Sequence, residues 1–150
     1  MKILMVCLGN ICRSPLAEGI MQSKIKDYQL SWEVDSAGTS AYHSGEKPDS
    51  RSIEVANRNG IDISKQRSRQ VIDSDLESFD LILVMYASNY NDTLRMAKDI
   101  EQKKKVKMIM NFATPGQNIE VPDPYWNNGF DTVYSMLEAA CEKLVLSFRS

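Results

Sequence analysis

Residues 2–25 read KILMVCLGNICRSPLAEGIMQSKI, and the order of residue types in this stretch decides the fold. The stretch opens with a short apolar run, from Lys2 to Val6, which is typical of a β-strand. A loop rich in Gly and Asn follows, and from Pro15 onward the apolar residues recur at helical spacing. These residues therefore predict a strand, a loop and a helix.

The same alternation continues along the chain. We expect further strands at 32–35, 79–85 and 106–110, and further helices at 49–58, 89–100 and 129–148. The segment 79–85, FDLILVM, is almost continuously apolar, as is typical of a parallel strand covered on both faces. Alternating strands and helices predict an α/β fold, with a parallel sheet between layers of helices.

The composition indicates one compact domain over residues 1–150, because 43% of the residues are hydrophobic and 25% are charged. The net charge of −2 argues against a nucleic-acid partner, since phosphate backbones demand a concentrated basic face. The one cationic run, Lys103 to Lys105, is expected to be a solvated helix end. No segment reaches the length of a transmembrane helix, so we expect no membrane insertion.

The chain contains three cysteines, Cys7, Cys12 and Cys141. Their odd number and irregular spacing fit neither a secreted disulfide framework nor a metal site built on a C-x-x-C pair. The sequence therefore predicts a reducing environment, and we expect a cytoplasmic protein. Cys141 falls in the last expected helix, where it is expected to be a core residue.

The octet from Cys7 to Ser14, CLGNICRS, joins the end of the first strand to the start of the first helix. Ligand sites of parallel α/β sheets lie at the carboxyl ends of strands, which is where Cys7 falls. A loop of this length can turn successive backbone N–H groups toward one tetrahedral anion, and the helix N-terminus adds donors and a favourable dipole. Gly9 permits backbone conformations that other residues resist. The octet therefore predicts a phosphate-binding loop.

Two residues of the octet suit phosphoryl transfer. Cys7 is the expected nucleophile, and the planar guanidinium of Arg13 can grip two phosphoryl oxygens at once. The positive environment should lower the pKa of the Cys7 thiol from about 8.5 to roughly 3.5–7.5. Ser14 can hydrogen-bond the sulfur and assist its departure. In the alternative interpretation, Cys7 is a buried strand end, and Arg13 and Ser14 are ordinary residues of a first helical turn.

A second element, VPDPYW at 121–126, places Asp123 between two prolines, which restrict the backbone and hold the carboxyl group in a fixed place. Asp123 is the expected general acid, a role that contributes typically about 10² to 10⁴ in rate. Tyr125 and Trp126, with Tyr42 as a weaker candidate, can form apolar walls along a phosphotyrosine ring. The alternative is a proline-rich surface turn whose aromatic residues pack on the core.

These segments closely resemble the low-molecular-weight protein tyrosine phosphatases. Four stretches carry the resemblance along nearly the whole chain: VCLGNICRSPLAE at 6–18, DSAGTS at 35–40, SRQV at 68–71 and DPYW at 123–126. The resemblance implies a four-stranded parallel sheet flanked by helices, a flavodoxin-like three-layer sandwich. It also implies hydrolysis of phosphotyrosyl proteins without a metal or organic cofactor. A tyrosine kinase is a further expected partner.

The resemblance also assigns roles within the site. Cys7 is implied as nucleophile, Arg13 as phosphate clamp, Ser14 as thiolate partner and Asp123 as general acid. The loop residues between Cys7 and Arg13 would bind phosphate and support the loop: Leu8, Gly9, Asn10, Ile11 and Cys12. Asn10 would shape the loop, with Ser36 as a supporting hydrogen-bond partner. Cys12 would form a reversible disulfide with the nucleophile under oxidation and so protect it.

Two positions depart from the family pattern. Many relatives carry a histidine where this chain has Gln66, and an aspartate where it has Tyr86. Both positions belong to the support around the phosphate loop in the family, so the changes imply an altered brace and an altered thiolate pKa. The only histidine, His43, does not match the family position and is expected to be a solvated loop residue.

Four other functions compete with this interpretation. An arsenate reductase needs further cysteines, and none lies between Cys12 and Cys141. Phosphoarginine phosphatases of this fold resemble one another in carrying threonine where this chain has Ile11, so Ile11 favours phosphotyrosine. A non-catalytic phosphotyrosine-binding module needs neither a nucleophile nor an acid. A redox sensor that uses Cys7 and Cys12 is the fourth alternative.

Overall fold

A computed structural model describes residues 1–149 as a parallel sheet between layers of helices. The sheet has four strands in the order β2-β1-β3-β4. The strands are β1 (Lys2–Cys7), β2 (Glu33–Gly38), β3 (Leu81–Val84) and β4 (Val106–Met108). All neighbouring strands run parallel, so the four-stranded parallel α/β sheet expected from the sequence is confirmed.

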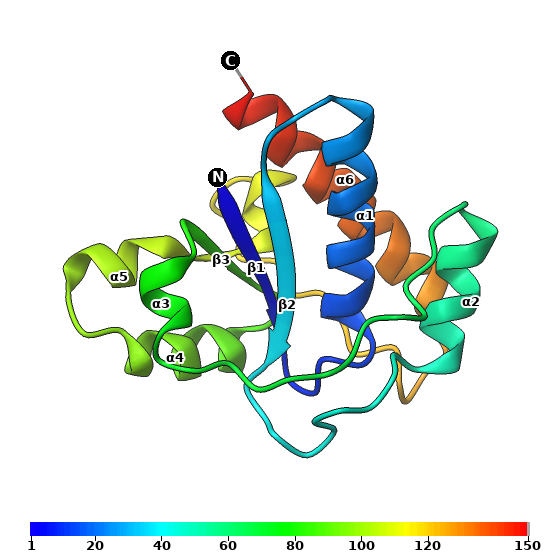
Figure 1. Ribbon diagram of the computed structural model, residues 1–150, viewed down its shortest axis with the longest axis horizontal. Coiled ribbons are helices and arrows are strands. Elements are labelled where there is room, and N and C mark those ends of the chain that lie inside the picture. Colours follow the sequence, from blue (N-terminus) through cyan, green and yellow to red (C-terminus); the bar gives the residue numbers. More distant parts are fainter. Residues whose placement is uncertain (150) are drawn as a thin grey trace.

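Helices cover both faces of the sheet, as Figure 1 shows. On one side lie α1 (Arg13–Asp27), α2 (Ser50–Arg58) and α6 (Phe130–Phe148). On the other side lie α3 (Asp75–Ser78), α4 (Ala87–Met96) and α5 (Ile100–Lys105). Alternate residues of β1 enter different cores: Ile3 and Met5 pack in the core beside α1 and α6, and Leu4 and Val6 pack in the other core.

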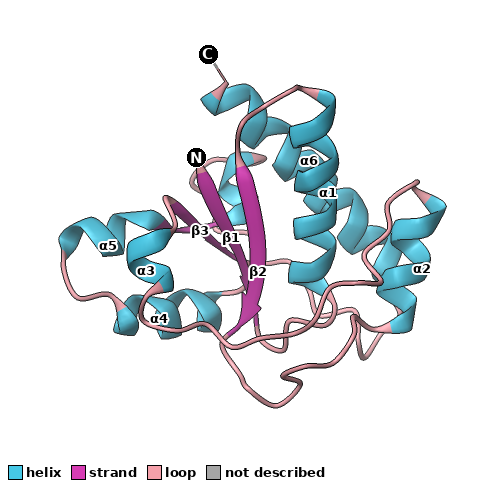
Figure 2. Ribbon diagram, viewed as in Figure 1, coloured by secondary structure: helices cyan, strands magenta, loops and turns pink. Residues whose placement is uncertain are grey.

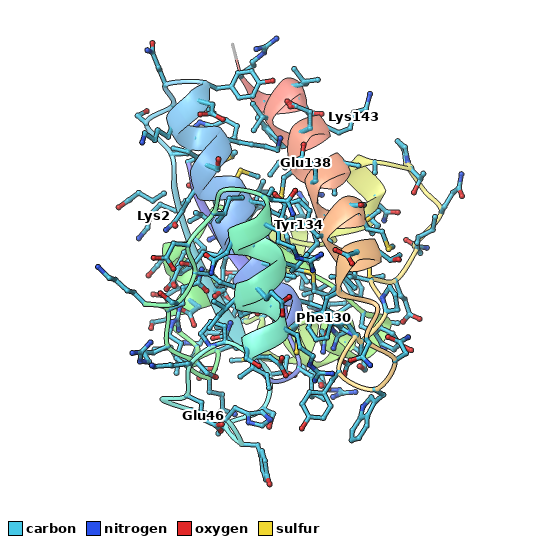
Figure 3. The ribbon with its side chains drawn as sticks, turned by 90° about the vertical axis from the view of Figure 1, so that its right-hand side faces the viewer. Lys2, Glu46, Phe130, Tyr134, Glu138 and Lys143 are labelled. Carbon is cyan, nitrogen blue, oxygen red and sulfur yellow. The ribbon has the colours of Figure 1, made fainter. Side chains whose placement is uncertain are left out.

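The longest helices, α1 and α6, lie side by side on the same face of the sheet (Figure 3). Lys24 of α1 donates a hydrogen bond to Glu138 of α6 over 2.8 Å. Buried apolar residues of both helices, among them Leu16 and Leu137, join the larger core. This packing fixes α1, whose first two residues are the last two of the Cys7–Ser14 octet.

The carboxyl ends of the strands form one edge of the sheet, where long loops gather (Figure 2). The register places Cys7 beside Gly38 of β2, and Val6 beside Val84 of β3. The loops that follow these strands therefore meet at one place, as expected for a ligand site in a parallel sheet.

Several expected boundaries are corrected by the structure. The expected helix 89–100 is two helices, because Ala97 is extended (ψ 132°) and the side chain of Asp99 accepts the N–H of Gln102 to start α5. The expected strand 106–110 ends at Met108, and a 3₁₀ turn, η1 (Ile109–Phe112), follows. The short helix α3 was not expected, since four residues carry too little periodicity to be detected.

The cationic run is only partly a solvated helix end. Lys103 and Lys104 are exposed, but Lys105 is half-buried and donates hydrogen bonds to the carbonyl oxygens of Leu76 and Glu77 at 2.8 and 3.1 Å. Lys105 thus ties α5 to α3. Within residues 1–149, no helix has both the length and the apolar character needed to span a membrane.

Candidate active site

The Cys7–Ser14 octet forms a tight loop at the end of β1. Cys7 is 2% exposed, and its Sγ accepts the backbone N–H of Asn10 at 3.2 Å and lies 3.0 Å from Ser14 Oγ. Helix α1 begins at Arg13, directly after Cys12. The sulfur therefore lies beside backbone and hydroxyl donors that can stabilise negative charge on it.

Asn10 holds the loop in shape. Its φ of 57° is left-handed, a conformation that asparagine adopts more readily than most residues. Its side chain is buried and makes three hydrogen bonds: Nδ2 donates to Ser14 Oγ (2.7 Å) and Ser36 Oγ (3.0 Å), and Oδ1 accepts the N–H of Arg69 (3.1 Å). Asn10 thus connects the loop to β2 and to the segment around Arg69.

The hydrogen-bond network ends at a buried carboxyl group that the sequence interpretation did not single out. Ser36 Oγ donates to Glu18 Oε1 over 2.6 Å, which links Glu18 through Ser36 and Asn10 to Ser14. Burial raises the pKa of Glu18 from 4.5 to about 7; Asp35 acts in the same direction, and the Ser36 hydrogen bond and Arg69 oppose it. Glu18 is therefore a titratable group behind the loop.

The structure reassigns the conformational role that the sequence suggested for Gly9. The left-handed residue of the loop is Asn10, whereas Gly9 is confined by His43, whose Cδ2 would lie 3.0 Å from an added Cβ. A stricter requirement falls on Gly38, where a Cβ would lie 2.6 Å from the carbonyl oxygen of Leu8. Gly38 therefore allows β2 to approach the loop closely.

Arg13 is buried and held from several directions. Its Nη1 donates to the carbonyl oxygen of Val121 at 3.0 Å, and its Nη2 lies 3.8 Å from Asp123 Oδ2. The Tyr86 ring lies 5.7 Å from the guanidinium carbon, within the range of a cation–π contact. Tyr86, one of the two positions expected to depart from the family pattern, therefore lies beside the guanidinium.

The 121–126 segment is held by a residue that sequence reasoning missed. Asp123 Oδ1 accepts the backbone N–H of Tyr125 at 3.0 Å, which fixes the turn locally. Arg51 of α2 donates from Nη1 to the carbonyl oxygen of Tyr125 (3.2 Å) and to Asn128 Oδ1 (2.7 Å). Its guanidinium also lies over the rings of Tyr125 and Phe130. Arg51 also pairs with Asp49, two residues away, but no sequence motif marks its contacts with the 121–128 region, which are more than seventy residues away.

These elements enclose a cavity of about 490 Å³ at the carboxyl ends of the strands. Ten of the residues that the sequence singled out line it: Cys7, Leu8, Gly9, Ile11, Cys12, Arg13, Tyr42, Asp123, Tyr125 and Trp126. The other three of the thirteen expected site residues, Asn10, Ser14 and Ser36, are buried and support the loop through hydrogen bonds. The cavity is open, since the Tyr42 and Trp126 side chains on its edge are 85% and 83% exposed.

His43 and Ser40 also line the cavity, although sequence reasoning did not place them there. His43 lies in a loop, as expected, but it is half-buried and only partly solvated. Its Nδ1 lies 2.8 Å from Glu46 Oε2, and its ring packs edge-on against Tyr42 at 4.8 Å between centroids. Glu46, labelled at the bottom of Figure 3, lies on the loop that also carries His43. The contact with Glu46 and the ring packing orient His43 and Tyr42 along one side of the cavity.

Gln66 and two of the three cysteines are buried or half-buried around the loop and in the core. Gln66 donates from Nε2 to the carbonyl oxygen of Pro15 at 3.1 Å, so it braces the start of α1. Burial, with smaller effects of nearby Asp49, Cys7 and Asp123, raises the pKa of the Cys12 thiol to about 12. Cys141 is fully buried in the core, as expected. Among residues 1–149, no three His, Cys, Asp or Glu side chains group closely enough to hold a metal ion.

The structure is an α/β protein with a parallel sheet, a strand-terminal thiol and a buried arginine beside one cavity. These residues make a candidate anion site with a candidate cysteine nucleophile. The family model described as low molecular weight phosphotyrosine protein phosphatase matches residues 2–150. The chain therefore belongs to the low molecular weight phosphotyrosine protein phosphatase family, whose members are hydrolases.

Individual relatives agree with this assignment. The chain is 38% identical over 145 residues to the human low molecular weight phosphotyrosine protein phosphatase. The aligned region covers 93% of this chain and 90% of the human protein. It is also similar to the crystal structure of a protein tyrosine phosphatase from Entamoeba histolytica, with 41% identity, a TM-score of 0.92, and coverage of 98% and 96% of the two chains. The crystal structure of a Drosophila arginine phosphatase matches with 28% identity, a TM-score of 0.93, and coverage of 100% and 99%.

Proposed function

We propose that this protein hydrolyses phosphotyrosine monoesters through a cysteinyl-phosphate intermediate on Cys7, within a single catalytic domain of residues 1–150. One observation carries the proposal. The Cys7 sulfur lies within reach of the Asn10 N–H and the Ser14 hydroxyl, in a cavity that also contains Arg13 and Asp123. A nucleophile, an anion clamp and an acid are thus brought together from two distant segments.

In the first step, the Cys7 thiolate attacks the phosphorus, so that an S–P bond forms as the bond to the tyrosine oxygen breaks. Arg13 binds the equatorial phosphoryl oxygens with its paired N–H groups. The protonated carboxyl group of Asp123 gives its proton to the departing phenolate oxygen. The short distance between Arg13 and Asp123 supports this division of roles, because both groups border the same site.

In the second step, water attacks the phosphorus of the intermediate. Asp123, now a carboxylate, takes a proton from this water as the S–P bond breaks and inorganic phosphate forms. The electron pair of the broken bond returns to Cys7, where the Ser14 hydroxyl and the Asn10 N–H stabilise the thiolate.

The aromatic rim supports phosphotyrosine as the substrate. Tyr125 and Trp126 pack edge to face at 4.8 Å, and Tyr42 lines the same cavity, so flat apolar surfaces surround its mouth. Ile11 lines the cavity where phosphoarginine phosphatases resemble one another in having threonine. We propose phosphotyrosyl proteins as substrates, with a tyrosine kinase supplying them. The free thiols of Cys7, Cys12 and Cys141 support a reducing, cytoplasmic location.

The test measures phosphate release from p-nitrophenyl phosphate and phosphotyrosyl peptides, without metal and with reductant. Cys7→Ser should abolish turnover, and Asp123→Ala should lower kcat by about 10² to 10⁴. Mass spectrometry of quenched Asp123→Ala reactions should detect a phosphate adduct on Cys7. Phosphoarginine peptides and arsenate serve as competing substrates for the same preparations.

Each alternative function predicts a different result. Turnover by Cys7→Ser equal to that of the wild type would eliminate the cysteinyl-phosphate mechanism. Faster hydrolysis of phosphoarginine than of phosphotyrosine would show that the protein is a phosphoarginine phosphatase. Binding of phosphotyrosyl peptides without any hydrolysis by the wild type would indicate a binding module.

A further inference from the structure

A second groove, of about 700 Å³, adjoins the active-site cavity. The two hollows share four lining residues: Leu8, Arg13, Asp123 and Trp126. The second groove continues over the start of α4 and the segment that precedes Asp123, where Tyr86, Asn89 and Glu120 line it. A peptide whose phosphotyrosine enters the cavity would therefore have flanking residues within reach of this groove.

The charge of the groove selects a cation. Glu120 Oε2 accepts the N–H of Ala87, the first residue of α4, at 2.8 Å. The Glu120 carboxylate therefore already interacts with the positive end of the α4 helix dipole. Arg13 and Asp123 also line the groove, and their side chains pair with each other at 3.8 Å between Nη2 and Oδ2. Glu120 is then the carboxylate that repels an incoming anion and attracts a cation.

The aromatic residues favour the same kind of ligand. The face of the Tyr86 ring already lies near the guanidinium of Arg13, at 5.7 Å. Trp126 is 83% exposed on the shared border, which leaves its indole free to contact a bound molecule. Indole and phenol faces attract ammonium and guanidinium groups, and they also pack against the methylene stems of long basic side chains.

We propose that this groove binds the side chain of a lysine or arginine that lies close in sequence to the phosphotyrosine of the substrate. Glu120 supplies the opposite charge, and Tyr86 and Trp126 supply aromatic surface. This inference rests on the proposed phosphotyrosine phosphatase function and adds a preference for basic substrate segments to it.

The experiment compares kcat/KM for phosphotyrosyl peptides that carry lysine, alanine or glutamate at each of the three positions on either side of the phosphotyrosine. At one or two positions, lysine should raise kcat/KM about 5- to 20-fold over alanine at low ionic strength. Most of the gain should lie in KM, and it should shrink in 0.5 M salt because exposed charges are screened. Glutamate at the same positions should lower kcat/KM.

Glu120→Gln removes the charge but keeps an amide oxygen that can accept the Ala87 N–H. In this variant the ratio of kcat/KM for the lysine and alanine peptides should fall to about 1–2. Glu101→Gln is the matched control, because it removes the same charge from an exposed position of α5 that does not line the groove. The ratio should stay at its wild-type value in this control.

Three results would overturn the inference: a wild-type ratio near 1 at every position, a preference for glutamate, or a lysine preference that Glu120→Gln leaves intact. The substrate p-nitrophenyl phosphate has no flanking side chain, so its hydrolysis tests the proposed function separately. If p-nitrophenyl phosphate and the alanine peptides are hydrolysed while the lysine-to-alanine ratio of kcat/KM stays near 1, only the proposed preference for basic residues is refuted. If no aryl phosphate is hydrolysed, both proposals fail.

Discussion

At the scale of single residues, Asn10 combines a left-handed backbone with three side-chain hydrogen bonds in the Cys7–Ser14 loop. Asn10→Ala should destabilise the protein by about 2–4 kcal/mol, because it leaves polar partners unpaired and strains alanine at positive φ. It should also lower kcat/KM for p-nitrophenyl phosphate by about 10- to 100-fold, since Ser14 loses a partner that orients it toward Cys7. Urea denaturation and steady-state kinetics measure the two effects.

Asn10→Gly separates the two causes. Glycine adopts positive φ without strain, so this variant should regain about 1 kcal/mol of the stability lost in Asn10→Ala, while its activity stays low. Wild-type activity in Asn10→Gly would show that the side-chain hydrogen bonds of Asn10 do not support the site.

At the scale of elements, α2 holds the segment that carries Asp123. Arg51 of α2 contacts Tyr125 and Asn128 through hydrogen bonds, so Arg51→Ala should loosen this segment and misplace the carboxyl group of Asp123. We expect kcat to fall about 3- to 10-fold with p-nitrophenyl phosphate, and further with phenyl phosphate, whose poorer leaving group depends more on an acid. Steady-state kinetics with both substrates measure the difference.

Arg58→Ala is the matched control on the same helix, since Arg58 pairs with Asp131 at 3.3 Å and both side chains are largely exposed. This variant should keep wild-type kinetics with both substrates. An equal loss on the two substrates in Arg51→Ala would contradict a role through Asp123 and indicate a general effect on the fold.

The elements also show where sequence reasoning succeeds and where it stops. The strand, loop and helix of 2–25 were predictable because apolar periodicity and the octet occur together in one segment. The division of 89–100 into α4 and α5 was not, because the break at Ala97 leaves no proline or glycine as a signal. Likewise, Arg51 and His43 reach the site only through contacts between distant segments, which no local pattern encodes.

At the scale of the whole molecule, the buried carboxyl group of Glu18 makes stability depend on pH. Burial, the largest cause, raises its folded pKa to about 7, above the 4.5 of the free group. The folded state therefore binds this proton more tightly than the unfolded state. The contribution of Glu18 to stability is fully present below pH about 4.5 and is lost as pH rises through about 7.

Glu18→Gln should remove this pH dependence, because glutamine stays neutral and its amide oxygen can still accept the hydroxyl of Ser36. At pH 8 the variant should be more stable than the wild type by on the order of 1–3 kcal/mol, and at pH 4.5 the two should be similar. Urea denaturation of both proteins between pH 4.5 and 8 gives the difference in their free energies of unfolding. Asp35, Arg69 and all other titratable groups are present in both proteins, so their contributions cancel to first order. A difference that stays constant across this range would show that Glu18 titrates at the same pH in the folded and unfolded states, and that the polar network behind Cys7 holds a charged carboxylate throughout.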